Sequence, residues 1–409
     1  MTLLERAPAP TPSSPSGAPE PPKRVSIWRS LAEGELVAVR VVIMLAVIWA
    51  IFEAQNSRFL SAVNLTNLTL QIAAIGLIST GVVLVLLLGE IDLSVGAVSG
   101  LCAGVMAVLT VKHGWPPVAG IGAALALGAL IGTFNGFMVT RFGIPSFVVT
   151  LAGSLAWTGA LLWVLGDTGT INLPNDIITD LAGTFYGTGV AIAVGILGVG
   201  GFAAISLRRE ARRRKAGLES RGVTWLLVSC GVVGLAFAVA IYVFAQDRGL
   251  PLAVIILVGT VMLFAAITEH TMWGRHLYAV GGNIEAARRA GIAIDRVRVI
   301  VFALASMLAA AGGVMAASRL FAVNQSSGGS DTLLLAIAGP VIAGTSLFGG
   351  RGTVWSALLG ALVIGSISNG IDLLGLSSDV RFMITGAVLL VAVTIDALAR
   401  RRRMQAGRR

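Results

Sequence analysis

Charged side chains are scarce in this sequence. Of its 409 residues, 12% are charged and 56% are hydrophobic, and the mean hydropathy is +0.88. Soluble globular proteins have about 25% charged residues, so this composition excludes a water-soluble enzyme and a disordered chain. The two cysteines, Cys102 and Cys230, both lie in apolar runs. Their number and position exclude a small secreted domain stabilised by disulfides.

Motifs for catalysis and nucleotide binding are also missing. The three histidines, His113, His270 and His276, are scattered over loops, and neither H-E-x-x-H nor G-x-S-x-G occurs. The sequence has no G-x-x-x-x-G-K-[ST] loop, which cradles ATP phosphates in many ATPases. We therefore expect no enzyme activity, no metal and no cofactor on this chain. Any energy from ATP must come from another polypeptide.

Apolar runs long enough to cross a lipid bilayer fill most of the chain. A membrane-spanning helix needs about 20 mostly apolar residues to cross about 30 Å of hydrocarbon. This pattern predicts an all-α, polytopic membrane bundle of about 12 transmembrane helices, of which the shortest (333–348) could instead be re-entrant. The predicted spans are 36–54, 68–88, 94–111, 117–139, 146–166, 187–207, 222–245, 251–268, 298–317, 333–348, 353–373 and 380–398.

Basic residues are distributed unevenly between the loops. Twelve spans place both termini on one side, and 24 of the 30 Lys and Arg residues lie on that side, against five on the other. Loops rich in Lys and Arg stay in the cytoplasm, so we expect both termini in the cytoplasm of a bacterial cell, with the chain in the inner membrane. The net charge of +10 lies in short blocks between apolar runs, so we expect the lipid bilayer and no nucleic acid as partner.

Composition divides the chain into three parts. Residues 1–35, rich in Pro, Ser and Ala, are typical of a disordered cytoplasmic tail. Residues 36–398 form the predicted transmembrane domain, with a cytoplasmic loop at 269–297, and residues 399–409 form a basic cytoplasmic tail. The basic loop 208–221 is explained by the cytoplasmic bias of positive charge, with contact to anionic lipid as the alternative.

Glycines recur at four-residue intervals in two predicted spans. The first set is Gly96, Gly100 and Gly104. The second set, in the span 117–139, has the same spacing. Such spacing puts the glycines on one helix face, where backbones can approach closely. Two interpretations remain open: tight helix packing, or a gap between helices that becomes a substrate path.

The segment 89–96 places two acids between two apolar runs. Glu90 and Asp92 are separated from those runs by almost no polar residue. Charge at membrane depth is costly and normally faces protein or a wet cavity. The segment is therefore either part of a substrate path or a tight cytoplasmic turn, in which Asp92 caps a helix starting near Leu93.

A short helix is predicted inside the cytoplasmic loop. Gly281-Gly282-Asn283 is typical of a turn, with Asn283 a good N-cap. A helix over 284–290 would then end at Gly291. Glu285 near its start and Arg288 near its end both suit the helix dipole. A short surface helix between two spans is a candidate for docking into a cytoplasmic partner.

Several segments resemble one known family. Glu285-Ala286-Ala287, three residues and then Gly291 resemble the E-A-A-x-x-x-G coupling loop of ABC importer permeases. The run GRHLYAVGGNIEAARRAGI (274–292) is similar to the form found in ribose/xylose-type sugar permeases. The same family is resembled, in the same order, by EIDLSVG (90–96), NGFMVTRFGIPSFVVTLAGSLAWTG (135–159) and GGRGTVWSALLG (349–360).

The resemblance covers residues 40–398 and has two departures. Many members have Gly where this chain has Glu90, and many have fewer spans. Two additional spans and a basic loop lie here between the segment 167–186 and the coupling loop. Both departures resemble the xylose-type permeases, which favours a pentose, D-xylose above others, as the substrate.

The resemblance implies an ABC importer permease fold and a set of partners. Two copies of the chain would form the pore, two ABC ATPase subunits would bind ATP and grip residues 282–292, and a periplasmic sugar-binding protein would dock outside. The ATPase-coupling residues would be Gly281, Gly282, Asn283, Glu285, Ala286, Ala287, Arg288 and Gly291. Our candidates for the path of an uncharged sugar are polar groups in or beside spans: Gln71, Glu90, Asp92, Ser94, Asn135 and Asn369.

Other functions remain as alternatives at this point. An ion-coupled secondary sugar transporter should carry carboxylates deep inside several spans, and only Glu90 and Asp92 approach this. A membrane enzyme would need a cluster of ligands or nucleophiles. A receptor-like protein would use the basic loop 208–221 as its effector. Each polar candidate could also simply bond a neighbouring helix.

Overall fold

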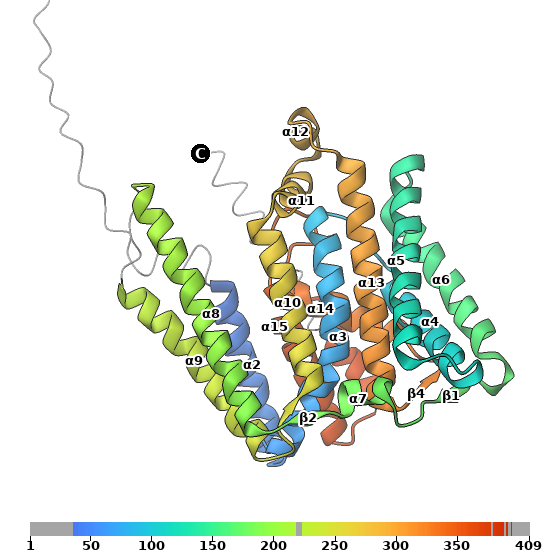
Figure 1. Cartoon of the computed structure of the whole chain (residues 1–409), viewed down its shortest axis with the longest axis horizontal. Coiled ribbons are helices and arrows are strands. Elements are labelled where there is room, and N and C mark those ends of the chain that lie inside the picture. The colour runs from blue at the N-terminus through green and yellow to red at the C-terminus, as the bar shows by residue number, and fades with distance from the viewer. Residues whose placement is uncertain (1–35, 218–222, 378, 388–389, 392–393, 395–409) are drawn as a thin grey trace, which may run out of the picture.

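The computed structural model describes the chain except for residues 1–35, 218–222, 378, 388–389, 392–393 and 395–409. The described part is a bundle of helices with four very short strands (Figure 1). The helices are α2 (Leu36–Gln55), α3 (Ala62–Leu88), α4 (Val95–Ala107), α5 (Pro117–Phe142), α6 (Ser146–Leu165), α7 (Ile177–Gly183), α8 (Thr188–Lys215), α9 (Val223–Ala245), α10 (Leu252–His270), α11 (Met272–Gly282), α12 (Ile284–Arg289), α13 (Ile294–Leu320), α14 (Ser330–Ile342) and α15 (Trp355–Leu373).

The predicted spans agree with these helices. Each predicted span from 36–54 to 353–373 overlaps a helix, although only the first part of 333–348 is helical, and nine helices of the described residues are long and apolar enough to cross a membrane. A π-helical turn, η2 (Val108–Lys112), extends α4. The last predicted span, 380–398, is described in part: residues 380–387, 390, 391 and 394 are helical, and the others lie outside the described residues. The polytopic helical bundle is therefore confirmed.

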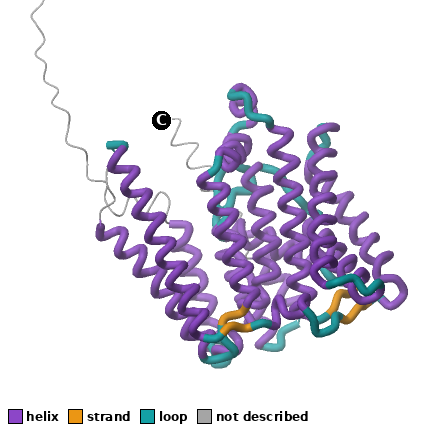
Figure 2. The backbone as a smooth tube through the Cα atoms, viewed as in Figure 1, coloured by secondary structure: helices purple, strands orange, loops and turns teal. Residues whose placement is uncertain are grey.

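The two ends of the bundle carry different structures. One end, here called the elbow end, carries α11 and α12, of which α12 projects beyond the neighbouring helices (Figure 1). The opposite end, here called the strand end, carries α7 and two antiparallel strand pairs (Figure 2). The strands are β1 (Thr170–Asn172) with β4 (Ala322–Asn324), and β2 (Phe185–Tyr186) with β3 (Leu250–Pro251).

Helix α13 runs through the centre of the bundle and packs against α3, α4 and α5. Glycines allow the closest of these contacts. A Cβ on Gly132 would overlap the carbonyl oxygen of Phe302, and one on Gly128 would lie 2.6 Å from the carbonyl oxygen of Ser306. The glycine row Gly128, Gly132 and Gly136 thus faces the backbone of α13, which confirms its interpretation as tight helix packing.

The predicted span 333–348 contains a short helix flanked by irregular backbone. Helix α14 has 13 residues, or about 20 Å at 1.5 Å per residue, which is too short to cross the hydrocarbon alone. The chain nevertheless passes from β4 at the strand end to Gly349, which contacts Gly89 and Gly281 at the elbow end. Irregular backbone at this depth is tolerated because protein surrounds it. This backbone lies close to α4, because an added Cβ at Gly100 of α4 would overlap the carbonyl oxygen of Ser327, just before α14.

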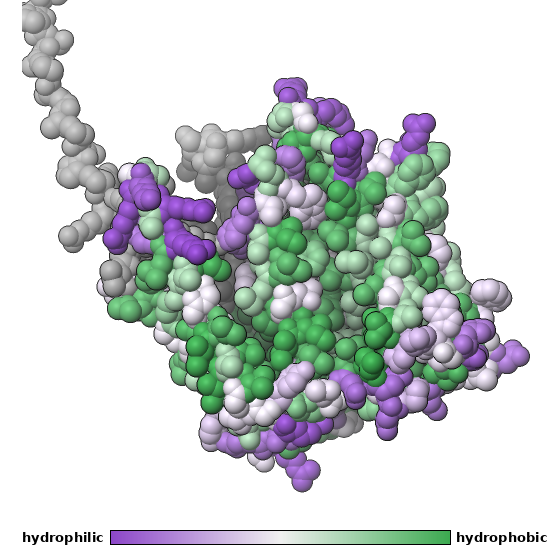
Figure 3. Space-filling model, in the orientation of Figure 1, coloured by the Kyte–Doolittle hydropathy of each residue, from purple (hydrophilic) through white to green (hydrophobic). Residues whose placement is uncertain are grey.

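Helices α2, α8 and α9 lie to one side of the central bundle (Figure 1). In the most apolar stretch of α9, none of the residues is buried inside the bundle, and in that of α8 only 11% are. The α8–α9 pair packs on itself, with the Phe237 ring against Gly198. On the face shown in Figure 3, apolar side chains form a band between polar ends. Such a band is the surface expected to face lipid.

Candidate functional site

The elbow (residues 271–293) is built by local hydrogen bonds. The Thr271 side chain caps α11 by accepting from the Gly274 N–H at 3.1 Å, and the Asn283 side chain caps α12 by accepting from the Ala286 N–H at 3.0 Å. At the other end of α12, Gly291 has φ +77°. The N–H groups of Gly291 and Ile292 donate to the carbonyls of Arg288 and Ala287, which is a Schellman motif.

The predicted short helix, its cap and its glycine stop are confirmed, but the predicted turn at Gly281-Gly282 is wrong. Both glycines are the last residues of α11. A Cβ on Gly281 would overlap the Leu87 carbonyl oxygen and would lie 2.8 Å from the Gly350 nitrogen, whereas one on Gly282 would meet nothing within 4 Å. Gly281 is therefore required for close contact between helices rather than for a turn.

One face of the elbow is anchored and the other is exposed. Ala287 is 2% exposed and belongs to the central core with Leu277 and Val280. The Tyr278 hydroxyl donates to the Gly352 carbonyl at 3.0 Å. Burial, helped by the negative charge of Glu269, raises the pKa of Tyr278 to about 12, so this hydroxyl keeps its proton. Contacts of these kinds fix the elbow to the bundle.

The outward face of α12 carries opposite charges. Glu285 and Arg288 form an ion pair at 2.9 Å, and both side chains are 65% exposed. Glu285 lies in the first turn and Arg288 in the last, so the charge of each interacts favourably with the helix dipole. The elbow therefore presents a short, firmly bounded and polar helix beyond the neighbouring helices.

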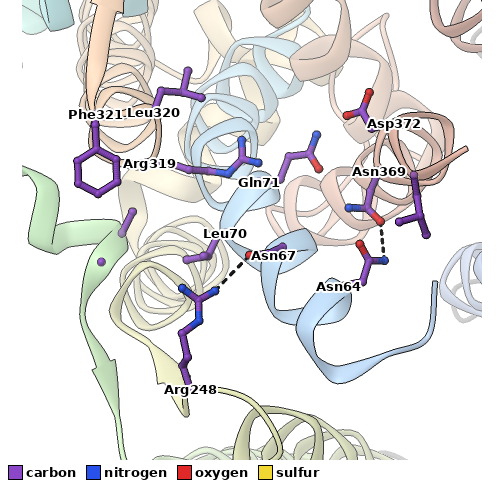
Figure 4. A pocket seen from close by; sticks show the side chains of 13 residues that line it. Asn64, Asn67, Leu70, Gln71, Arg248, Arg319, Leu320, Phe321, Asn369 and Asp372 are labelled. Atoms are coloured by element: carbon purple, nitrogen blue, oxygen red, sulfur yellow. Dashed lines mark hydrogen bonds between the residues drawn. The ribbon is translucent and has the colours of Figure 1, made fainter. Parts of the chain in front are cut away.

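A polar pocket opens at the strand end, where helices α3, α13 and α15 meet (Figure 4). Its volume is about 730 Å³, within the range of small-molecule sites. We call it the strand-end pocket. It is lined by Asn64, Asn67, Leu70, Gln71, Ala182, Gly183, Arg248, Arg319, Leu320, Phe321, Asn369, Asp372 and Leu373.

Hydrogen bonds hold several of these side chains in place. Asn64 donates to Asn369 Oδ1 at 2.8 Å, and Arg248 donates to Asn67 Oδ1 at 3.2 Å (Figure 4). Gln71 and Asn369, both predicted from sequence, line this same pocket. Amide and guanidinium groups supply the donors and acceptors that the hydroxyl groups of an uncharged sugar require.

Three other candidates form a separate buried cluster. Ser94 donates through both its backbone N–H (2.8 Å) and its hydroxyl (2.6 Å) to Asp92 Oδ1, and Asn135 donates to Ser94 Oγ at 3.2 Å. Asp92 is 5% exposed, and Ser94 and Asn135 are fully buried. These residues do not line the strand-end pocket, so their place on the substrate path stays a prediction.

The segment Gly89–Ser94 is not the tight turn that was one interpretation of the sequence. It passes along the first turns of α6, where the N–H groups of Ile91 and Leu93 donate to the side chains of Ser146 and Thr150. Helix α4 begins only at Val95. The hydroxyl groups of α6 replace the helical hydrogen bonds that this segment lacks.

Glu90 lies apart from both polar sites. Its carboxylate forms an ion pair with Arg298 of α13 at 2.8 Å, and the two side chains are 15% and 22% exposed. The pair joins the start of the non-helical segment Gly89–Ser94 to α13, just beyond the elbow. Its role in the sugar path also stays a prediction.

Sequence reasoning missed most of the pocket. Asn64, Asn67 and Gln71 follow a spacing of three and four residues, which puts them on one face of α3, and this signal was available. Arg319 and Asp372 come from the last turns of α13 and α15, and no local pattern pairs them. Among the described residues, no group of three or more His, Cys, Asp or Glu side chains could hold a metal ion.

Comparison with known proteins places this geometry in context. The model of a family described as "Branched-chain amino acid transport system / permease component" matches residues 64–393. The xylose transport system permease protein XylH of Escherichia coli K12 is 35% identical over 367 residues, which are 90% of this chain and 92% of XylH.

Two further relatives are of the same kind. XylH of Haemophilus influenzae is 36% identical over 87% of this chain and 95% of its own length. The ribose import permease protein RbsC of Bacillus subtilis is 32% identical over 83% of this chain and 87% of its own length. No solved structure matches significantly.

Proposed function

The chain belongs to the family described as the permease component of branched-chain amino acid transport systems, and from this premise we propose that it is the membrane permease subunit of an ABC importer for a pentose, D-xylose above others. It is a multi-pass membrane protein and a transport subunit. The observation that carries the proposal is the elbow: a short capped helix, anchored by Ala287 and exposed at Glu285 and Arg288.

In this proposal the elbow is the docking site for a separate ATPase subunit. The chain has no phosphate-binding loop of its own, so ATP binding belongs to that partner. Residues 282–292 would sit in a groove of the ATPase, with Ala287 and Gly291 fixing the shape of the elbow and Glu285 presenting its charge. Because the elbow packs on α3 and α13, movement of the ATPase would shift the bundle.

The strand-end pocket is the proposed outer site for the sugar. It combines the amides of Asn64, Asn67, Gln71 and Asn369 with the charges of Arg319 and Asp372. Hydroxyl groups of a pentose both donate and accept hydrogen bonds, so they match such a mixed lining. A periplasmic sugar-binding protein would deliver the sugar at this end.

The remaining assignments follow from charge and from the family. With the elbow in the cytoplasm, the strand end faces the periplasm and both termini lie in the cytoplasm of a bacterium, with the chain in its inner membrane. The pore is proposed to need a second copy of this chain. The large apolar surface left exposed by a single copy (Figure 3) supports burial in lipid and against a neighbour.

The ion-coupled alternative is less well supported. Asp92 is a buried carboxylate, but it is held by Ser94, and Glu90 is paired with Arg298. The strand-end pocket has a carboxylate of its own, Asp372, but this carboxylate forms an ion pair with Arg381. A transporter driven by protons or sodium would need a carboxylate that is free to bind the ion where the substrate binds.

Reconstitution tests this proposal. We expect the chain to co-purify with an ATPase and, in liposomes supplied with that ATPase and a xylose-binding protein, to take up labelled D-xylose only when ATP is present. Uptake should persist when a protonophore dissipates the proton gradient at constant ATP. Uptake that stops under the protonophore would favour the secondary transporter, and ribose in place of xylose would correct the substrate.

A further inference from the structure

We propose that Glu90 and Arg298 are positioning residues, whose ion pair transmits movement of the elbow to the non-helical segment Gly89–Ser94. This inference rests on the proposed function. In this role the ion pair would contact neither sugar nor ATP. It would connect the ATPase-facing helix mechanically to the buried polar cluster of Asp92, Ser94 and Asn135.

The geometry of the pair is that of a strong contact. Arg298 Nη2 lies 2.8 Å from Glu90 Oε1, and more than three quarters of each side chain is hidden from solvent. Arg298 Nε is buried and has no hydrogen-bond partner among the described residues. A shielded carboxylate is therefore the main compensation for a shielded guanidinium, and the two groups should move together.

On one side, the pair is fixed to the elbow. Gly291 ends α12, and α13 starts at Ile294, so Arg298 lies in the second turn of the helix that follows directly. Ala287 of α12 and Val297 of α13 are both buried in the central core. A displacement of α12 should therefore carry the start of α13, and Arg298 with it.

On the other side, the pair is fixed to the segment that leads into the membrane. Glu90 is the second residue after α3 ends, and its N–H donates to the Val85 carbonyl at 3.2 Å. Four residues later, Ser94 meets both Asp92 and Asn135. The segment lacks the continuous helical hydrogen bonds of α3 and α4, so it should yield to a displacement more easily than either helix. A pull on Glu90 should therefore reach the buried cluster.

A charge-swap experiment tests the inference. The variants are E90Q, R298Q and the double exchange E90R/R298E, reconstituted with the ATPase and the sugar-binding protein. The measurement is the number of sugars transported per ATP hydrolysed. We expect each single variant to lower this ratio about tenfold, a usual size of coupling between sites, while hydrolysis continues, and the double exchange to restore most of the ratio.

A matched control removes another Glu–Arg pair. Glu210 pairs with Arg214 on α8 at 3.4 Å, in the last two turns of that helix, so E210Q should keep the wild-type ratio. If E90Q or R298Q fails to fold, E90D and R298K preserve both charges at altered reach and should give intermediate ratios. A merely structural pair would lower the amount of folded protein but leave the ratio per folded complex unchanged.

The outcomes separate this inference from the function on which it rests. A wild-type protein that shows no ATP-driven uptake would refute the proposed function. Wild-type coupling together with unchanged ratios in the single variants, or a double exchange as low as the singles, would overturn the role of the pair and leave the proposed function intact.

Discussion

The elbow and the strand-end pocket differ in how far apart in the sequence their interacting residues lie. In the elbow, Asn283 caps the N–H of Ala286 three residues away, and Glu285 pairs with Arg288. In the pocket, Asn64 bonds Asn369, which is 305 residues distant. Bonds between neighbouring residues set the ends of α12, and packing on the core holds it in place, whereas the pocket exists only when three helices are correctly packed.

In the proposed function, the elbow and the strand-end pocket have different tasks. A docking helix must present the same surface throughout a cycle, and short-range caps provide that. A sugar site must open and close, and a site between helices can do so when the helices shift. The contacts of Gly281 with Leu87 and Gly350 join the elbow to one end of α3. The other end of α3 lines the strand-end pocket.

Substitution at Gly281 should break that link and give the largest effect. In G281V the added side chain would overlap the Leu87 carbonyl oxygen, and backbone cannot yield as a flexible side chain can. We expect a loss of at least about 3 kcal/mol in stability, the upper range for overpacking, measured by thermal unfolding in detergent. The neighbouring G282A, with open space around its Cβ, is the control. Equal unfolding temperatures would contradict the close contact.

Charge reversal on α12 should separate docking from pocket integrity. E285K replaces the acid in the first turn, opposes the helix dipole and removes the pair with Arg288. We expect ATP-driven uptake to fall about tenfold or more, with normal insertion and unchanged sugar-pocket contacts. Uptake in proteoliposomes is the measurement, and E210K on α8 is the control. Normal uptake in E285K would remove α12 from the docking site.

Loss of an amide in the pocket should affect the sugar rather than the ATPase. Gln71 lines the strand-end pocket, and Q71L removes a donor and an acceptor worth about 1 kcal/mol when paired. We expect the sugar concentration for half-maximal uptake to rise about fivefold, with basal ATP hydrolysis unchanged. N175L, an exposed position at the strand end outside the pocket, should behave as wild type. An unaltered concentration dependence in Q71L would place the sugar elsewhere.

The smallest effect should come from the cap of α12. N283A removes the side chain that accepts the Ala286 N–H, at a cost of about 1 kcal/mol to the helix, while Asn283→Ser keeps a capping oxygen. We expect faster hydrogen exchange of the α12 amides in N283A and near-normal exchange in the Ser variant. Equal exchange in both would mean that packing of Ala287, rather than the cap, holds α12.

Prediction from sequence succeeded where a feature depends only on residues that are close together in the sequence. Apolar length gave the spans, and Asn283 and Gly291 gave the ends of α12. It failed at Gly281 and Gly282, because two glycines before a cap suit a turn equally well, and only the approach of Leu87 explains why α11 continues through them. It also gave no sign of the ion pair between Glu90 and Arg298, because the two residues lie 208 positions apart in the chain.

Membrane class, the spans and the exposed helix α12 could be predicted from the sequence alone, since hydropathy and capping act over one or a few turns of chain. Three groupings are visible only in the folded chain: Gln71 and Asn369 share a pocket with Arg319, Asp92, Ser94 and Asn135 form a separate buried cluster, and Glu90 pairs with Arg298. Those groupings depend on the approach of helices distant in sequence, which no local pattern of side chains specifies.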